Sequence, residues 1–254
     1  MKETRRGAWE IAANWRLYSN EDKSVMPHVG GTISQPGYLG TCPQSFGAKW
    51  LPATVPGTVL TTLIDRGVYP DPDFGLNNLA IPESLNKHDY WYRVEFPAPA
   101  AFAAGKRFTL HFGGINYSAE VWFNGHRVGE MRGAFERGVF DVTELVRPGT
   151  NALAVRVAPP PHPGIPAEQS IKDGPGYDGG LMLIDGPTFV DTEGWDWIPA
   201  IRDRDTGIWQ SVSLEETGTV TLGDPQVVTH LPLPDISTAD VEIHVPVHNT
   251  GTRR

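Results

Sequence analysis

The sequence of 254 residues contains a single cysteine, Cys42, which excludes an intrachain disulfide and a zinc cluster built from cysteines. It has no run of about 18 apolar residues, so we expect no transmembrane helix. The 21 Lys and Arg residues are outnumbered by 30 Asp and Glu residues. The resulting net charge of −9 argues against nucleic acid and anionic membranes as partners.

Targeting and catalytic motifs are also scarce. Glu10, Asn14 and Arg16 interrupt the residues after the basic N-terminus, so no signal peptide is predicted and the localisation stays open. No Gly-x-Ser-x-Gly occurs, and no phosphate-binding loop is found. His244 and His248 would lie roughly 13 Å apart on a strand, too far to share a metal ion. In the absence of these motifs, the sequence predicts no catalytic nucleophile, metal site or cofactor.

Turn-forming residues are abundant, with 28 glycines and 23 prolines, and they favour many short strands. Asn124-Gly125 predicts a tight hairpin, because both residues tolerate positive φ. One helix is predicted from Pro56 to Gly67. Otherwise the pattern predicts an all-β sandwich or jelly roll, with alternating strands at residues 90–96, 108–112, 120–123, 126–130, 138–142, 151–157 and 209–214.

A domain boundary is predicted after Gly223, which divides the chain into residues 1–223 and 224–254. In the second part, alternation from Val241 to Val247 predicts a half-buried strand. An immunoglobulin-like sandwich needs about 100 residues and seven strands, so this part would be only its beginning. We therefore expect the chain to be a fragment of a longer protein.

An unusual segment, residues 194–209, combines tryptophans, aspartates and arginines. A pyranose has an apolar C–H face and a rim of hydroxyls, which an indole and a carboxylate recognise, and Trp195, Asp196 and Trp197 supply both groups. In the alternative interpretation, the tryptophans fill one end of the sandwich. The aspartates then pair with the arginines beside them, which are Asp203, Asp205, Arg202 and Arg204.

Three blocks of sequence, residues 53–77, 90–125 and 194–209, resemble the β-mannosidase and exo-β-glucosaminidase branch of glycoside hydrolase family 2. The resemblance implies a jelly-roll (galactose-binding-like) β-sandwich at residues 1–223 and the first strands of an immunoglobulin-like sandwich at residues 224–254. Similar enzymes continue into a (β/α)₈ barrel whose two glutamates perform retaining hydrolysis. The catalytic residues are therefore expected in a barrel beyond Arg254.

The resemblance also implies roles for individual residues. Asp196 would hold sugar hydroxyls, and Trp195 and Trp197 would line the subsite. Asn77 matches a position near the sugar in some members, although an asparagine that caps a turn is an equal alternative. The expected partners are a β-mannoside or glucosaminide and the chain's own catalytic barrel. A free-standing carbohydrate-binding module and a purely structural domain stay open as alternatives, and similar enzymes are often periplasmic or secreted.

Overall fold

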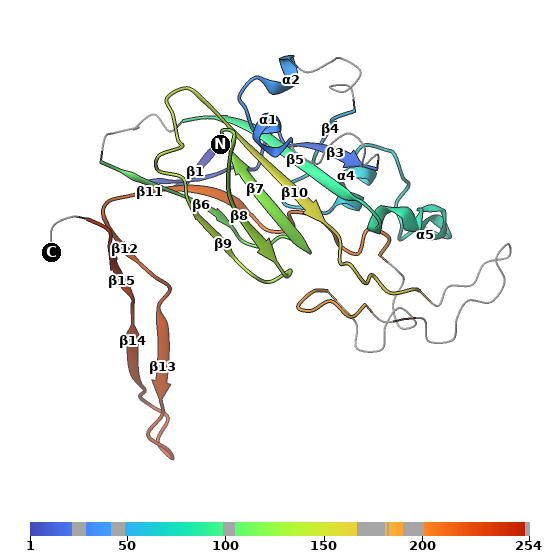
Figure 1. Ribbon diagram of the computed structural model, residues 1–254. Coiled ribbons are helices and arrows are strands. Elements are labelled where there is room, and N and C mark those ends of the chain that lie inside the picture. The colour runs from blue at the N-terminus through green and yellow to red at the C-terminus, as the bar shows by residue number, and fades with distance from the viewer. Residues whose placement is uncertain are drawn as a thin grey trace.

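The computed structural model describes residues 1–21, 29–41, 49–98, 105–166, 181, 183–189 and 201–251. Most of its regular structure is antiparallel β-sheet, and two sheets face each other to form a sandwich (Figure 1). The predicted all-β class and jelly-roll sandwich are confirmed. No helix among these residues is long and apolar enough to cross a membrane.

The first sheet has five strands in the order β1-β2-β11-β6-β9. Their bounds are Lys2–Arg5 for β1, Ala8–Glu10 for β2, Val212–Thr217 for β11, Arg107–Phe112 for β6 and Gly138–Asp141 for β9. The second sheet has six strands in the order β4-β3-β5-β10-β7-β8. Their bounds are Leu51–Pro52 for β4, Arg16–Asn20 for β3, Asp89–Pro97 for β5, Thr150–Ala158 for β10, Ser118–Phe123 for β7 and His126–Arg132 for β8.

The main core lies between the two sheets and consists of alternate residues of their strands. Phe108, Leu110 and Phe112 of β6 are at most 2% exposed, and Val121 and Phe123 of β7 are fully buried. This alternation is what a strand with one face on a core requires. The periodic signal therefore predicts both the strands and their inward faces.

A second apolar cluster covers part of the outer face of the six-stranded sheet. Helices α1 (Gly30–Ile33) and α2 (Tyr38–Thr41) pack there with Trp50. Trp91 is 2% exposed and the partly buried Trp122 packs against the same cluster, so both tryptophans belong to the hydrophobic core. Because this face is covered, β5 is buried at successive residues rather than at alternate ones.

The predicted Asn124-Gly125 hairpin joins β7 to β8, and the two residues have φ values of 47° and 92°. The predicted strands each overlap an observed one, but the strand expected from Trp209 begins only at Val212. Trp209 instead packs on Phe135 and Phe189 and donates its indole N–H to the Ala134 carbonyl at 2.8 Å. These contacts keep it out of the ladder.

The predicted helix is shorter than expected. Helix α4 spans Val59–Asp65, and Pro56 lies before its N-cap. Thr58 is the cap, because its hydroxyl accepts the backbone N–H of Thr61 at 3.2 Å. The N–H of Gly57 donates to the Ile208 carbonyl at 2.8 Å, which holds the preceding residues outside the helix.

The last described residues form two short ribbons that extend away from the sandwich (Figure 1). β12 (Val220–Leu222) pairs with β15 (Val247–Asn249), and β13 (Gln226–His230) pairs with β14 (Asp240–His244). The prediction of one half-buried strand here is wrong, because β14 ends at His244 and its five residues are exposed. Pro246, which has no N–H, separates β14 from β15. The domain division after Gly223 stays a prediction.

Candidate functional site

The candidate site lies at the end of the sandwich where residues 201–209 lead toward β11. Trp195, Asp196 and Trp197 lie outside the described residues, so their arrangement stays a prediction. The structure describes the chain again from residue 201. Arg202, Asp203 and Arg204 in this segment are at most 3% exposed. A burial this complete of consecutive charged residues requires specific partners.

Glu83 is the partner of both arginines. It belongs to the short helix η1 (Glu83–Asn86), and its Oε1 accepts the Nη1 of Arg202 at 2.9 Å. Its Oε2 accepts the Nη2 of Arg204 at 2.7 Å, and Oε1 also accepts the Nη1 of Arg204 at 3.3 Å. Burial alone would raise the pKa of Glu83, but the hydrogen bond and charge of Arg204, with Arg202, outweigh it and lower that pKa. The ion pairs expected within residues 202–205 are thus replaced by pairs with a distant glutamate.

Each guanidinium also donates a hydrogen bond to the backbone of a different segment at this end of the sandwich. The Nε of Arg202 donates to the Asn78 carbonyl at 3.1 Å, and the Nε of Arg204 donates to the Pro163 carbonyl at 2.7 Å. Asn86 donates from Nδ2 to the Arg202 carbonyl at 3.0 Å. We call Glu83, Arg202 and Arg204 the anchor, since they join η1, helix α5 and the loop at Pro163 to one another.

Asp203 fixes the same segment to helix α4. Its Oδ2 accepts the N–H of Leu60 at 2.6 Å, and the N–H of Val59 donates to the Thr206 carbonyl at 2.8 Å. Two backbone N–H groups in the first turn of the helix therefore find their hydrogen-bond acceptors in residues about 145 positions later in the chain. Burial raises the pKa of Asp203, and hydrogen bonds from Leu60, Thr58 and Asp205 oppose that shift.

Asp205 is a further buried acidic residue at this end of the sandwich, and its pKa is raised. Burial, followed by repulsion from Asp203, raises its pKa to about 7, while Arg204 acts in the opposite direction. Arg204 and Asp205 adopt left-handed φ values of 54° and 55°, and their carbonyls accept the Nδ2 of Asn116 at 2.8 and 3.2 Å. A buried amide thus holds the turn that carries this carboxyl.

The turn ends at a position that only glycine fits. Gly207 has a φ of 154° and pairs with Asn116 through both backbone groups, at 2.9 and 2.7 Å. A Cβ at Gly207 would lie 2.7 Å from the Gly57 oxygen and 2.7 Å from the Thr58 Cα. The close approach of two backbones therefore sets the course of the chain into β11.

Asn77 is the predicted site residue that the structure describes. It is half-buried at the start of helix α5 (Asn77–Ala80), and its Nδ2 donates to the Asp71 carbonyl at 2.9 Å. Its neighbour Asn78 contacts the anchor through Arg202. This bond fits the turn-capping alternative, and a role at the sugar stays a prediction.

Sequence reasoning missed Glu83 and the role of Asn116. Glu83 lies in an ordinary Pro-Glu-Ser turn, about 120 residues from the arginines that it binds, and no local pattern indicates such a partner. Asn116 belongs to the second block of resemblance, but its buried amide has no sequence signature. Within the described part of the chain, no group of three or more His, Cys, Asp or Glu side chains could hold a metal ion.

Comparison with known proteins identifies the fold's relatives. Residues 37–210 match the protein family described as glycosyl hydrolase 2 galactose-binding domain-like, which is more than half of the sequence. The chain belongs to this family. It covers the N-terminal domain of the β-mannosidase- and glucosaminidase-like enzymes of glycosyl hydrolase family 2.

Two relatives indicate the branch of glycosyl hydrolase family 2. The chain is 40% identical over 193 residues to a mannosylglycoprotein endo-β-mannosidase of Lilium longiflorum, which covers 74% of this chain and 19% of the relative. It is 30% identical over 236 residues to an exo-β-D-glucosaminidase of Streptomyces avermitilis, and this match covers 91% of this chain and 22% of the relative. The chain thus spans about a fifth of the length of these curated relatives.

Solved structures of family members share the fold. The exo-chitosanase of Amycolatopsis orientalis has a TM-score of 0.69 at 24% identity, over 95% of this chain and 24% of that one. The β-D-mannosidase of Dictyoglomus thermophilum has a TM-score of 0.64 at 24% identity, over 95% and 26%. At these identities, the similarity supports the architecture alone.

Proposed function

We propose that this chain is the non-catalytic sugar-binding part of a retaining, exo-acting β-glycosidase, and that it contributes one wall of the subsite for the terminal sugar. Asp196 accepts hydrogen bonds from sugar hydroxyls. Trp195 and Trp197 stack on the apolar face of the ring. The substrate class is a β-mannoside or β-glucosaminide, as the names of the relatives suggest.

The observation that carries this proposal is the anchor. Two guanidinium groups that are at most 3% exposed share one carboxylate, and together with the bond from Leu60 to Asp203 they fix residues 202–204, which follow residues 195–197 closely in the sequence. A domain that serves only as a buttress has no need for such a costly arrangement of buried charge at one loop. A binding wall needs it, because small errors in the position of a subsite weaken recognition.

The chemistry of hydrolysis belongs to a catalytic domain outside this chain. In a retaining enzyme, one carboxylate attacks the anomeric carbon, while a second protonates the departing oxygen and then activates water. The present residues position the sugar for that attack and exclude water from one side of it. The isolated chain should therefore turn over no aryl β-glycoside.

The test is Asp196→Ala in the complete enzyme encoded by the gene, assayed with aryl β-mannoside and β-glucosaminide. Loss of a hydrogen bond to a charged group costs about 1.5–3 kcal/mol, so kcat/KM should fall about 10- to 150-fold. The matched control is Asp240→Ala, which removes an exposed carboxylate of β14 and should leave kcat/KM unchanged.

Two results would contradict the proposal. Unchanged kcat/KM in the Asp196 variant would mean that the domain acts only as a buttress. Hydrolysis of aryl glycosides by the isolated chain of 254 residues, at a rate that persists through purification, would mean that catalytic groups lie within it.

A further inference from the structure

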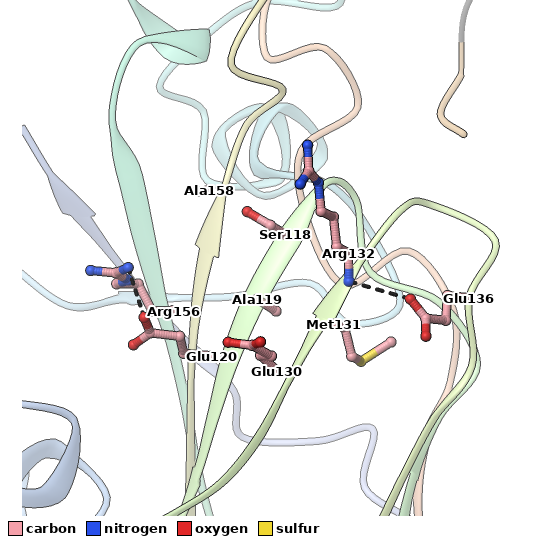
Figure 2. Close-up of a pocket in the computed structure, with 9 residues that line it drawn as sticks. All are labelled: Ser118, Ala119, Glu120, Glu130, Met131, Arg132, Glu136, Arg156 and Ala158. Carbon is pink, nitrogen blue, oxygen red and sulfur yellow. Dashed lines mark hydrogen bonds and ion pairs between the residues drawn. The ribbon is translucent and has the colours of Figure 1, made fainter. Parts of the chain in front are cut away.

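Two adjoining cavities lie on the outer face of the six-stranded sheet, on the half that α1 and Trp50 leave open. One has a volume of about 490 Å³ and is lined by strands β7, β8 and β10, as Figure 2 shows. The other, of about 530 Å³, lies beside it toward the anchor. They share Ser118 and Ala158 and so form one continuous surface groove, which we call the outer groove. Each volume is that of a small-molecule site.

The part of the outer groove near the anchor has two unlike walls. One wall consists of four prolines, whose flat rings present C–H groups without a hydrogen-bond donor: Pro159, Pro160, Pro161 and Pro163. The other side is lined by residues 86–89, where Lys87 and Asp89 offer an ammonium and a carboxylate, while Asn86 and His88 are only 3% and 6% exposed. This contrast matches the two faces of a sugar ring, which are apolar C–H surface and hydroxyl rim.

Both walls are held in place before any ligand arrives. Pro163 accepts a hydrogen bond from Arg204 at 2.7 Å, and the N–H of His162 donates to Asp185 at 2.5 Å. On the other wall, Asn86 bonds the Arg202 carbonyl at 3.0 Å, and His88 bonds Ser19 at 2.8 Å. A rigid groove reduces the entropy that a ligand loses on binding.

The second part of the outer groove is polar. Glu120 of β7 lies directly opposite Glu130 of β8 in the ladder, an arrangement of like charges that destabilises a sheet. Arg156 of β10 donates to Glu120 at 2.9 Å, as Figure 2 shows. Its Nε also lies 3.8 Å from a carboxylate oxygen of Asp89. Arg132 of β8 lies opposite Ser118 in the ladder. Several charge-assisted hydrogen-bonding groups thus follow one line across three strands.

The charged residues that line the outer groove restrict the kinds of ligand that it can bind. The two cavities together are lined by four carboxylates and three cationic side chains: Asp89, Glu120, Glu130, Glu136, Lys87, Arg132 and Arg156. The arginine at the centre is already paired with carboxylates, so a phosphate or polyanion finds no free cluster of positive charge. A ligand rich in hydroxyls, neutral or carrying amines, can use both the acceptors and the donors.

We propose that the outer groove binds an oligosaccharide of neutral or amino sugars through residues other than Asp196. The ring faces stack along the proline wall, and pairs of hydroxyls bond Glu120 and Arg156. The proposal goes beyond the terminal-sugar subsite and does not depend on it, because every group that it uses lies on the outer face of the sheet or on the loops beside it.

The test is a calorimetric titration of the chain of 254 residues with β-1,4-linked mannohexaose, the glucosamine hexamer and, as an anionic control, an oligogalacturonate. The first two should bind, and the oligogalacturonate should bind at least about tenfold more weakly. Ser118→Trp fills the point that the two cavities share and should weaken binding at least about tenfold. The matched control is Val139→Trp at an exposed position of β9 in the other sheet, which should bind normally.

Asp196→Ala separates the two sites. It should leave binding to the outer groove unchanged, whatever its effect on hydrolysis in the complete enzyme. If Ser118→Trp proves misfolded by circular dichroism, Glu120→Gln and Arg156→Gln decide, because they remove charge with little change of volume. Absence of binding by the unmodified chain at about 10 mM ligand would overturn the proposal. So would binding that is lost with Asp196→Ala and kept in the groove variants.

Discussion

The sandwich and the terminal ribbon contain the same sequence pattern with opposite outcomes. In β6, Phe108, Leu110 and Phe112 alternate with polar residues and are at most 2% exposed. In β14, Val241 and Ile243 alternate in the same way and are 55% and 61% exposed. The difference is the second layer, since β6 faces the other sheet, whereas β14 pairs with β13 alone among the described residues. Alternation predicts a strand, whereas burial depends on what lies opposite it.

Pairs of charged residues in the sandwich and in the ribbon also differ in their exposure to solvent. At the anchored end of the sandwich, Arg202 and Arg204 are nearly inaccessible to solvent and share Glu83. In the ribbon, the imidazole of His244 lies 2.9 Å from a carboxylate oxygen of Glu242, which is an ion pair only when the histidine is protonated, and each side chain is more than half exposed. Solvent and salt screen the second pair far more than the first. Position in the molecule therefore decides what each interaction contributes.

The largest contrast is expected from truncating matched apolar residues. Phe112→Ala should lower the free energy of unfolding by about 3–5 kcal/mol, because it leaves a cavity between the sheets. Ile243→Ala in β14 should change it by no more than about 0.5 kcal/mol. Urea denaturation followed by tryptophan fluorescence measures both. Equal effects would mean that the ribbon is buried in solution.

A smaller effect is expected at the anchor. Glu83→Ala leaves two buried guanidinium groups without their carboxylate and should cost about 2–4 kcal/mol, somewhat below a fully buried pair because Glu83 is 36% exposed. Glu130→Ala is the control, since that glutamate pairs with Arg127 at 75% exposure. It should change stability by about 0.5 kcal/mol at most. Similar losses in both variants would remove the distinction between the two kinds of ion pair.

The smallest effect is a dependence on pH. The pKa of Asp205 is about 7 in the folded chain against an ordinary value of 3.8, so the folded state holds a proton that the unfolded chain releases. Stability should therefore decrease as the pH rises from about 4 to about 7. Asp205→Asn should remove this slope and raise the free energy of unfolding at pH 8 by about 1–3 kcal/mol.

Thermal melts from pH 4 to pH 8 measure this difference, and Asp240→Asn in the ribbon serves as the control. An Asp205→Asn variant whose stability follows that of the unmodified chain at every pH would show that the carboxyl is ionised in both states.

Elements with local causes could be predicted from the sequence. Asn124-Gly125 dictates its hairpin by backbone preference, and the period of two in β6 indicates both strand and inward face. The start of α4 was predicted three residues too early, because Pro56 also suits a first helical turn. The capping bond from Thr61 to Thr58 decides otherwise.

Features with distant causes could not be predicted. Glu83 meets the arginines from about 120 residues away, and β11 pairs with β2 and β6, which precede it by about 200 and about 100 residues. The candidate site shares this property. Residue types at 195–197 suggest recognition of a sugar, but the groups that hold residues 202–204 come from segments that no local pattern links to them.

The place of β11 between β2 and β6 has a consequence for biosynthesis. Until Thr217 has left the ribosome, β11 is absent from the five-stranded sheet, and β2 and β6 each have an edge without a partner strand. The backbone N–H groups of Val59 and Leu60 in the first turn of α4 also lack the acceptors that residues 203–206 provide. Open edges of this kind invite pairing with other chains. A nascent chain that stops short of β11 is therefore a substrate for chaperones rather than a smaller folded domain.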